Sequence, residues 1–143
     1  MTRNRIQFPP DDTQALEQDE AWFFLQGNGS GDQRIRFHDY DEIYRHPGLY
    51  EQVFYDRLKC QSPAKVASIL RSAVERSGGE PSTLRVLDLG AGNGIMGEEL
   101  RRLGVSRLVG ADIIPEARDA YLRDRPGLYD DYLVCDLADP DQD

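Results

Sequence analysis

The 143-residue sequence has few of the features that mark secreted, membrane-spanning or metal-binding proteins. Its two cysteines, Cys60 and Cys135, lack metal-ligand spacing and can form at most one disulfide, so no metal site is predicted. No apolar run approaches the roughly 20 residues that a membrane helix needs, and no apolar stretch follows the basic N-terminus as in a signal peptide. These absences predict a cytoplasmic protein with two isolated thiols.

Basic residues are also scarce. Lys and Arg number 17 against 26 Asp and Glu, which gives a formal net charge of -9 at pH 7. Because affinity for nucleic acid depends largely on basic side chains that neutralise phosphates, this balance disfavours a nucleic-acid partner. A local basic patch could form from Arg34, Arg36 and Arg45, although a solvated charged surface is the simpler interpretation.

The length of the chain and its 39% of hydrophobic residues favour one compact domain, preceded by an N-terminal segment over residues 1–60 that is a candidate lid or cap. We expect this segment to be mainly helical, with a helix over 49–58. Residues 22–25 form an apolar cluster that must pack in a core, and residues 34–37 alternate in polarity, which predicts a short strand. Glycines at 27–31 predict a flexible break. The segment is rich in aromatic residues: Phe37, Tyr40, Tyr44, Tyr50, Phe54 and Tyr55.

A longer helix is predicted to begin near Ser62, a good N-cap, with Pro63 in the first helical position. Apolar residues recur in it at intervals of three and four, which predicts a single buried stripe. The stripe consists of Val66, Ile69, Leu70, Ala73 and Val74. The glycine pair that begins at Gly78 supplies the left-handed stop.

The remaining domain, residues 61–143, is predicted to have an α/β fold. Three strands are expected over residues 84–89, 107–112 and 132–136, and two helices over 93–103 and 115–123. Strands that alternate with helices indicate a parallel sheet with right-handed crossovers, a Rossmann-like βαβαβ unit. The first strand is short, apolar and rich in leucine and valine, so we expect it to be buried.

Three glycines, Gly90, Gly92 and Gly94, alternate in the turn between the first of these strands and the following helix. A side chain there would keep a ligand away from the backbone, and some of the three must also adopt positive φ. The helix start offers unpaired N–H groups and a partial positive charge, which suit a carboxylate or phosphate. Asp112 ends the second strand, where an acidic residue of a doubly wound sheet accepts the ribose hydroxyls of a nucleoside cofactor.

Two cofactors compete for this turn. Residues Gly92 to Gly97 match the G-x-G-x-x-G pattern of dinucleotide binding, as in a nicotinamide (NAD)-dependent oxidoreductase. That frame buries Asp88 inside the strand and sets the turn two residues late. If Gly90 ends the strand instead, Ile95 occupies the place of the third glycine. The pattern D-x-G-x-G-x-G has neither conflict and is favoured, with the oxidoreductase as the alternative.

Residues 86–94, Val-Leu-Asp-Leu-Gly-Ala-Gly-Asn-Gly, closely resemble the first motif of the class I S-adenosylmethionine-dependent methyltransferases. The resemblance extends over residues 62–137, about half the chain. It implies a Rossmann-like fold, S-adenosyl-L-methionine as cofactor, and methyl transfer to a small-molecule or protein acceptor. It further implies that the motif lines the methionine portion of the cofactor, with Asp88 near its ammonium group. The residues implied to line it are Gly90, Ala91, Gly92 and Gly94.

The same resemblance assigns binding residues to the ends of the next two strands. Asp112, followed by Ile113, matches the acidic residue that binds the ribose in this family. Asp136, followed by Leu137, matches the acidic residue that meets the adenine amino group.

The resemblance leaves the methyl acceptor and the catalytic residues unassigned, because such enzymes mainly align a nucleophile with the methyl group and need no base. Tyr40, Tyr44 or Tyr55 could face the sulfonium through cation–π contact, and His38 could act as a base towards a hydroxyl. The alternative is that these aromatic side chains form the core of the N-terminal segment, and that His38 is structural.

The sequence departs from the family at its C-terminus, where residues 138–143 form a polar tail instead of a fourth strand. A βαβαβ half alone leaves a sheet edge and an apolar face uncovered. We therefore expect an incomplete methyltransferase domain that could self-associate through the uncovered edge. A non-catalytic fragment or module that binds the cofactor is the corresponding alternative.

Overall fold

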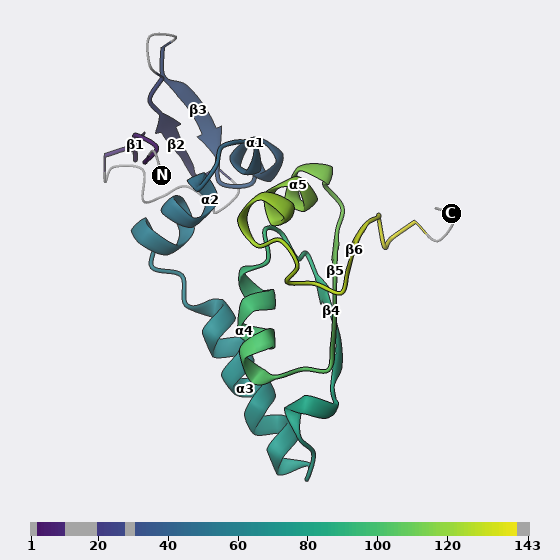
Figure 1. The fold of residues 1–143 in the computed structure, drawn as a ribbon. Helices are drawn as coiled ribbons and strands as arrows, with labels where there is room; N and C mark the ends of the chain where they lie inside the picture. The colour runs from purple at the N-terminus through teal and green to yellow at the C-terminus, as the bar shows by residue number, and fades with distance from the viewer. Residues whose placement is uncertain (1–2, 11–19, 28–30, 140–143) are drawn as a thin grey trace. The chain divides into compact units, whose positions relative to one another are not determined.

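The computed structural model describes residues 3–10, 20–27 and 31–139 (Figure 1). The chain divides into two compact units, Met1–Leu58 and Lys59–Asp143, where its length predicted one domain with a preceding segment. The centre of the expected glycine-rich break and the end of the polar tail lie outside the described residues. No helix in the described part of the chain is long and apolar enough to span a membrane.

The first unit is built on an antiparallel sheet of order β1-β2-β3. Its strands are β1 (Ile6–Gln7), β2 (Trp22–Leu25) and β3 (Gln33–Arg36), followed by α1 (Tyr40–Arg45), α2 (Leu49–Glu51) and the π-helical η2 (Gln52–Arg57). The short strand expected near residues 34–37 is confirmed. The helix expected over 49–58 is present as α2 and η2, but the segment is not helical throughout, because the apolar cluster at 22–25 is the central strand of the sheet.

Apolar side chains of the sheet and the helices form the core of this unit. The buried members are Phe23, Leu25, Ile35, Ile43, Leu49 and Val53. Phe8, Phe37 and Phe54 pack against them, with Phe8 and Phe37 in edge contact at 6.1 Å between ring centroids. Aromatic residues therefore stabilise the first unit chiefly by the apolar area they bury.

The second unit is the α/β part of the chain. Its sheet has the order β4-β5-β6, and both strand pairs are parallel. The strands are β4 (Arg85–Leu89), β5 (Arg107–Asp112) and β6 (Asp131–Val134), joined by α4 (Ile95–Leu103) and α5 (Pro115–Asp124). The predicted alternation of strands and helices is thus confirmed. Figure 1 shows α3 (Ser62–Arg76) and α4 side by side, with the strands beyond α4.

Within the described part of the second unit, helices cover one face of the parallel sheet and leave the other face exposed. Val86 and Asp88 of β4 face the helices, whereas Leu87 and Leu89 are 52% and 59% exposed. Leu133 of β6 is exposed on the same outer face. The prediction that β4 is buried is therefore wrong for three of its five residues, because an apolar run predicts burial on both faces and the described elements cover only one.

The helix α3 also differs from its prediction. It begins one residue earlier, with Gln61 as N-cap, and no side chain caps it. Ala67 is the one buried residue in α3, and Val66 and Ile69 of the expected buried stripe are 51% and 66% exposed. Part of the stripe stays exposed because α3 packs mainly against α4. One neighbouring helix is too narrow to cover the whole apolar face.

Candidate functional site

The glycine-rich loop, residues 90–94, joins the end of β4 to the start of α4. Gly90, Gly92 and Gly94 have φ values of 68°, 54° and 92°, so the expected positive φ is confirmed at all three. Any other L-residue would adopt this conformation at a cost of about 1–2 kcal/mol. The N–H groups of Gly90 and Ala91 both donate to the carbonyl of Ala111, at 2.9 and 3.0 Å. The loop is thereby fixed to the end of β5.

The glycines of this region differ in what surrounds them. A Cβ added at Gly94 would lie 2.9 Å from Leu128, and one added at Gly97 would lie 2.6 Å from the hydroxyl of Tyr129. A Cβ added at Gly90 would meet nothing within 4 Å. Packing inside the protein therefore explains why Gly94 and Gly97 lack side chains, but it does not explain Gly90, where the backbone is open.

Asp112 lies at the end of β5 and holds two backbone groups. Its Oδ2 accepts the N–H of Gly92 at 2.9 Å, and its Oδ1 accepts the N–H of Ile114 at 3.2 Å. Ile114 is the N-cap of α5, and Asp112 binds the N–H of this residue without capping the first turn of the helix. Asp112 thus connects the glycine-rich loop with the start of α5.

Asp88 lies on the helix-covered side of the sheet, 9% exposed. The hydroxyl of Tyr129 donates to its Oδ2 at 2.7 Å. Burial raises the pKa of Asp88 above its ordinary value, the bond from Tyr129 opposes this change, and the nearby charge of Asp112 adds to it. Burial also raises the pKa of Tyr129, so this hydroxyl remains a donor. One oxygen of Asp88 is therefore engaged inside the protein, whereas the resemblance implies a contact with the cofactor ammonium group.

The other residues implied to bind the cofactor lie at the same end of the sheet, with different exposure. Ala91 is buried in the core of the second unit, whereas Ile113 and Leu137 are 60% and 62% exposed. The Oδ1 of Asp136 accepts the N–H of Ala138 at 2.9 Å, in the turn after β6. Because the N–H of residue 135 donates to the carbonyl of residue 112, the chain after β6 runs beside the end of β5.

Sequence reasoning missed the tyrosines beneath the loop. The ring of Tyr132 stacks on Tyr121 with centroids 4.9 Å apart, and Tyr129 meets both rings edge-on. The hydroxyl of Tyr132 donates to the carbonyl of Gly92 at 2.8 Å. A glycine inside β5, Gly110, was the available signal, because a Cβ there would lie 2.9 Å from the ring of Tyr132.

The catalytic candidates of the N-terminal segment lie in the first unit. Tyr40 contacts both His38, at 5.7 Å between ring centroids, and Tyr44, at 6.4 Å. Tyr44 is 6% exposed and so serves as a core residue. His38 is exposed and Tyr40 is half-buried.

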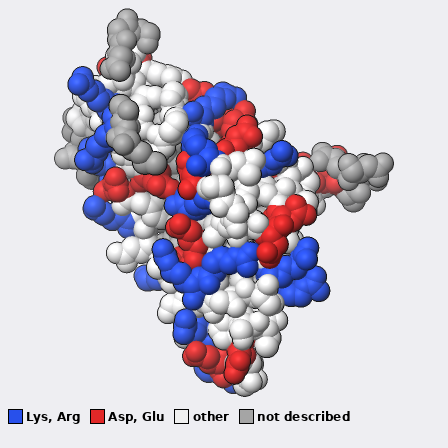
Figure 2. Space-filling model, viewed as in Figure 1, with Lys and Arg blue, Asp and Glu red and all other residues white. Residues whose placement is uncertain are grey.

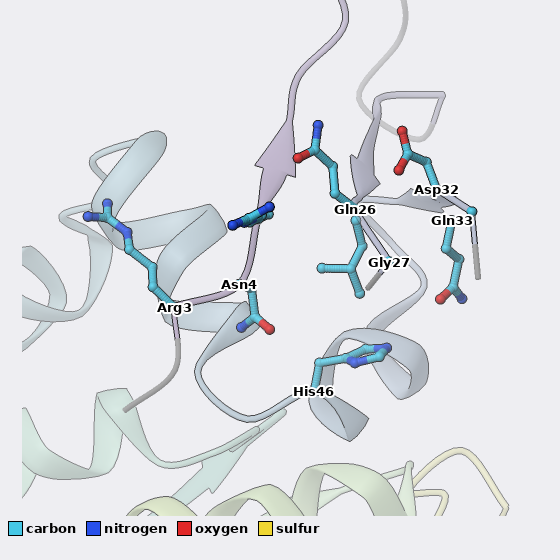
Figure 3. A pocket seen from close by; sticks show the side chains of 10 residues that line it. Arg3, Asn4, Gln26, Gly27, Asp32, Gln33 and His46 are labelled. Atoms are coloured by element: carbon cyan, nitrogen blue, oxygen red, sulfur yellow. The ribbon is translucent and has the colours of Figure 1, made fainter. Parts of the chain in front are cut away.

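A hollow of about 720 Å³ also lies in the first unit (Figure 3). Its lining is mostly polar and includes Arg3, Asn4, Arg5, Asp32 and His46. Several of these groups already serve the fold: the amide of Asn4 donates to a backbone carbonyl at 3.0 Å, and His46 contacts a glutamate at 3.1 Å. The hollow includes none of the residues predicted for the cofactor site.

The three arginines of the expected basic patch have local partners. Arg36 pairs with Asp39 at 2.8 Å, and Arg45 pairs with Glu42 at 2.9 Å. Arg34 lies over an indole ring, 4.6 Å from its centroid. In Figure 2 basic and acidic side chains adjoin one another across the face in view. Among the described residues, no group of three or more His, Cys, Asp or Glu side chains could hold a metal ion.

No protein-family model, no curated protein and no solved structure matches this chain. Its function is therefore inferred from the loop geometry and from the motif in residues 86–94. Chemically, the loop region combines an open stretch of backbone, an acidic side chain at a strand end and a rigid aromatic support. This combination suits binding of a small polar ligand at the carboxyl ends of parallel strands.

Proposed function

We propose that the chain binds S-adenosyl-L-methionine at the carboxyl ends of β4 and β5, as part of a class I, Rossmann-like methyltransferase acting on a small molecule or a protein. The observation that carries this proposal is the open backbone of Gly90 at the carboxyl end of β4, in a loop that Asp112 holds through Gly92. The φ of 68° at Gly90 already favours glycine, and the open space beside it leaves room for a ligand to lie against the backbone.

Asp112 fits the role of ribose-binding residue. Each of its oxygens accepts one backbone N–H, at 2.9 and 3.2 Å, and a carboxylate oxygen has a second lone pair to offer. Those lone pairs suit the two ribose hydroxyls. The carboxylate of Asp112 would then bind the loop and the ligand at the same time. Because it already holds the N–H of Gly92 in the free protein, the loop would be ordered before the ligand binds.

The cofactor, when bound, would supply a methyl group on a positively charged sulfonium: a nucleophile of the acceptor would bond to the methyl carbon as the C–S bond breaks, and neutral S-adenosylhomocysteine would leave. The chain's own contribution is to bind and orient, because proximity alone accelerates such a displacement strongly. The backbone at Gly90 would hold the methionine portion of the ligand, and the carboxylate of Asp112 would hold its ribose. Of the catalytic candidates, His38 and Tyr40 are accessible enough to meet an acceptor, whereas the buried Tyr44 is not.

The geometry weakens the case for a dinucleotide. Gly97 would be the third glycine of that pattern, where a side chain would separate the helix from the strand. Its lack of a side chain is already accounted for by Tyr129, whose hydroxyl would lie 2.6 Å from a Cβ. Gly97 therefore gives no separate support to the hypothesis of an NAD-dependent oxidoreductase.

The proposal is tested by calorimetric titration of the purified chain with S-adenosylmethionine, its demethylated product S-adenosylhomocysteine, and NAD. We expect binding of the first two and no heat with NAD. Binding of NAD alone, or no binding by a chain that circular dichroism shows to be folded, would contradict the proposal. Transfer of label from methyl-labelled cofactor to protein or small-molecule fractions then separates an enzyme from a non-catalytic binding module.

A further inference from the structure

We propose that Tyr132 is a positioning residue that holds the glycine-rich loop in the conformation that receives the cofactor. It does so together with Asp112 by binding both backbone groups of Gly92. This inference rests on the proposed function. It adds that β6, the third strand of the parallel sheet, controls the geometry of the loop that follows β4, the first strand of that sheet.

Gly92 is held from two sides by residues distant in the sequence. Its N–H donates to the Oδ2 of Asp112 at 2.9 Å, and its carbonyl accepts the hydroxyl of Tyr132 at 2.8 Å. Gly92 is buried and has a φ of 54°. On either side of it in the loop, Gly90 is exposed and Gly94 is packed against Leu128. Because glycine has the greatest conformational freedom of any residue, a loop with three of them needs external bonds to remain in one conformation.

Tyr132 is itself rigidly placed. Its ring lies parallel to that of Tyr121, with an interplanar angle of 9°, and Tyr129 closes the cluster at 5.5 Å. In the strand register Tyr132 is opposite Gly110, which leaves room for the ring above β5. Burial raises the pKa of the Tyr132 hydroxyl, so it stays protonated and able to donate.

Tyr129 and Asp88 form a second bond in the same cluster, but at a different place. Their contact of 2.7 Å fixes a side chain of β4 before the loop begins, and it involves no backbone group of residues 90–94. The hydroxyl of Tyr132 is the group in this cluster that reaches the loop backbone. A change confined to that hydroxyl should therefore alter the loop while leaving the aromatic packing in place.

The test compares Tyr132→Phe with Tyr121→Phe. Both variants remove one hydroxyl from the same stacked pair, but the Tyr121 hydroxyl makes no hydrogen bond within the described part of the chain. Affinity for S-adenosylmethionine is measured by calorimetry, and amide hydrogen exchange of residues 90–94 is measured by NMR in the free protein. We expect Tyr132→Phe to bind about fivefold more weakly, as for the loss of one hydrogen bond, with faster exchange in the loop. Tyr121→Phe should match the wild type in both measurements.

The outcomes separate this inference from the proposed function. If the wild type binds the cofactor and Tyr132→Phe binds it equally well, the inference is overturned and the proposed function stands. If Tyr121→Phe weakens binding as much as Tyr132→Phe, the effect belongs to the aromatic packing, and the inference is again overturned. If the wild-type chain binds no cofactor, both fall, whatever the exchange rates show.

Discussion

The two halves of the glycine-rich region carry glycines for different reasons. In the packed half, Gly94 and Gly97 leave room for Leu128 and Tyr129, which would lie 2.9 and 2.6 Å from an added Cβ. In the open half, Gly90 faces space that no described atom fills within 4 Å. Positive φ favours glycine at both Gly90 and Gly94, but of these two only Gly90 has open space beside its backbone that a ligand could fill. Substitutions in the packed half should reduce stability, and substitutions in the open half should reduce binding.

The largest expected effect is in the packed half. Gly97→Val places a branched side chain against Tyr129, inside a cluster that cannot move aside easily. We expect a loss of about 3 kcal/mol in the free energy of unfolding, measured by urea denaturation. Gly97→Ala should lie between this variant and the wild type. An unchanged unfolding midpoint for Gly97→Val would show that the helix and the tyrosine are not in close contact.

The next effect concerns Asp112, which links the loop to the ligand in the proposed site. Removing its carboxylate in Asp112→Ala should weaken S-adenosylmethionine binding on the order of tenfold to a hundredfold, because charged hydrogen bonds are lost. Asp112→Asn keeps one carbonyl oxygen as an acceptor and should show a smaller loss by the same calorimetric titration. Equal affinity for wild type and Asp112→Ala would remove Asp112 from the site.

A smaller effect, on the pH dependence of stability, is expected from the buried carboxyl group of Asp88. Because burial raises its pKa in the folded chain, the folded state keeps this proton over a pH range in which the unfolded chain has lost it. The resulting stabilisation is complete below the unfolded-state pKa and is lost as the pH rises through the folded-state pKa.

The variant Asp88→Asn lacks this titration and keeps an oxygen that can accept the Tyr129 hydroxyl. As the pH rises from acid to neutral, the free energy of unfolding of Asp88→Asn should therefore increase relative to that of the wild type. Urea denaturation of both proteins over a pH series measures this difference. A difference that stays constant with pH would contradict the raised pKa of Asp88.

The sequence predicted the second unit better than the first, for a physical reason. Strands that alternate with amphipathic helices leave a local pattern, so the parallel sheet and the positive φ of Gly90 could be anticipated. The strand at Trp22–Leu25 is a continuous apolar run without alternation, and only its pairing with β1 and β3 makes it a strand. Such pairing is not encoded locally.

The candidate site was predictable to a similar extent. The glycines and Asp112 could be found from their spacing, because backbone conformation and strand ends are local properties. The contacts of Tyr129 with Asp88 and of Tyr132 with Gly92 join residues 41 and 40 positions apart, which no local pattern reveals. The exposure of Leu87 was also hidden, since an apolar strand looks the same whether one face or both are covered.

The most direct test of the difference between the halves is a comparison of Gly90→Ala with Gly104→Ala. Both glycines have positive φ, 68° and 84°, and neither has an atom within 4 Å of an added Cβ, so both variants should lose about 1–2 kcal/mol of stability. Calorimetric titration with S-adenosylmethionine should show affinity reduced at least about tenfold in Gly90→Ala and unchanged in Gly104→Ala. Equal affinities in the two variants would mean that Gly90 serves only the backbone conformation and that no ligand lies against it.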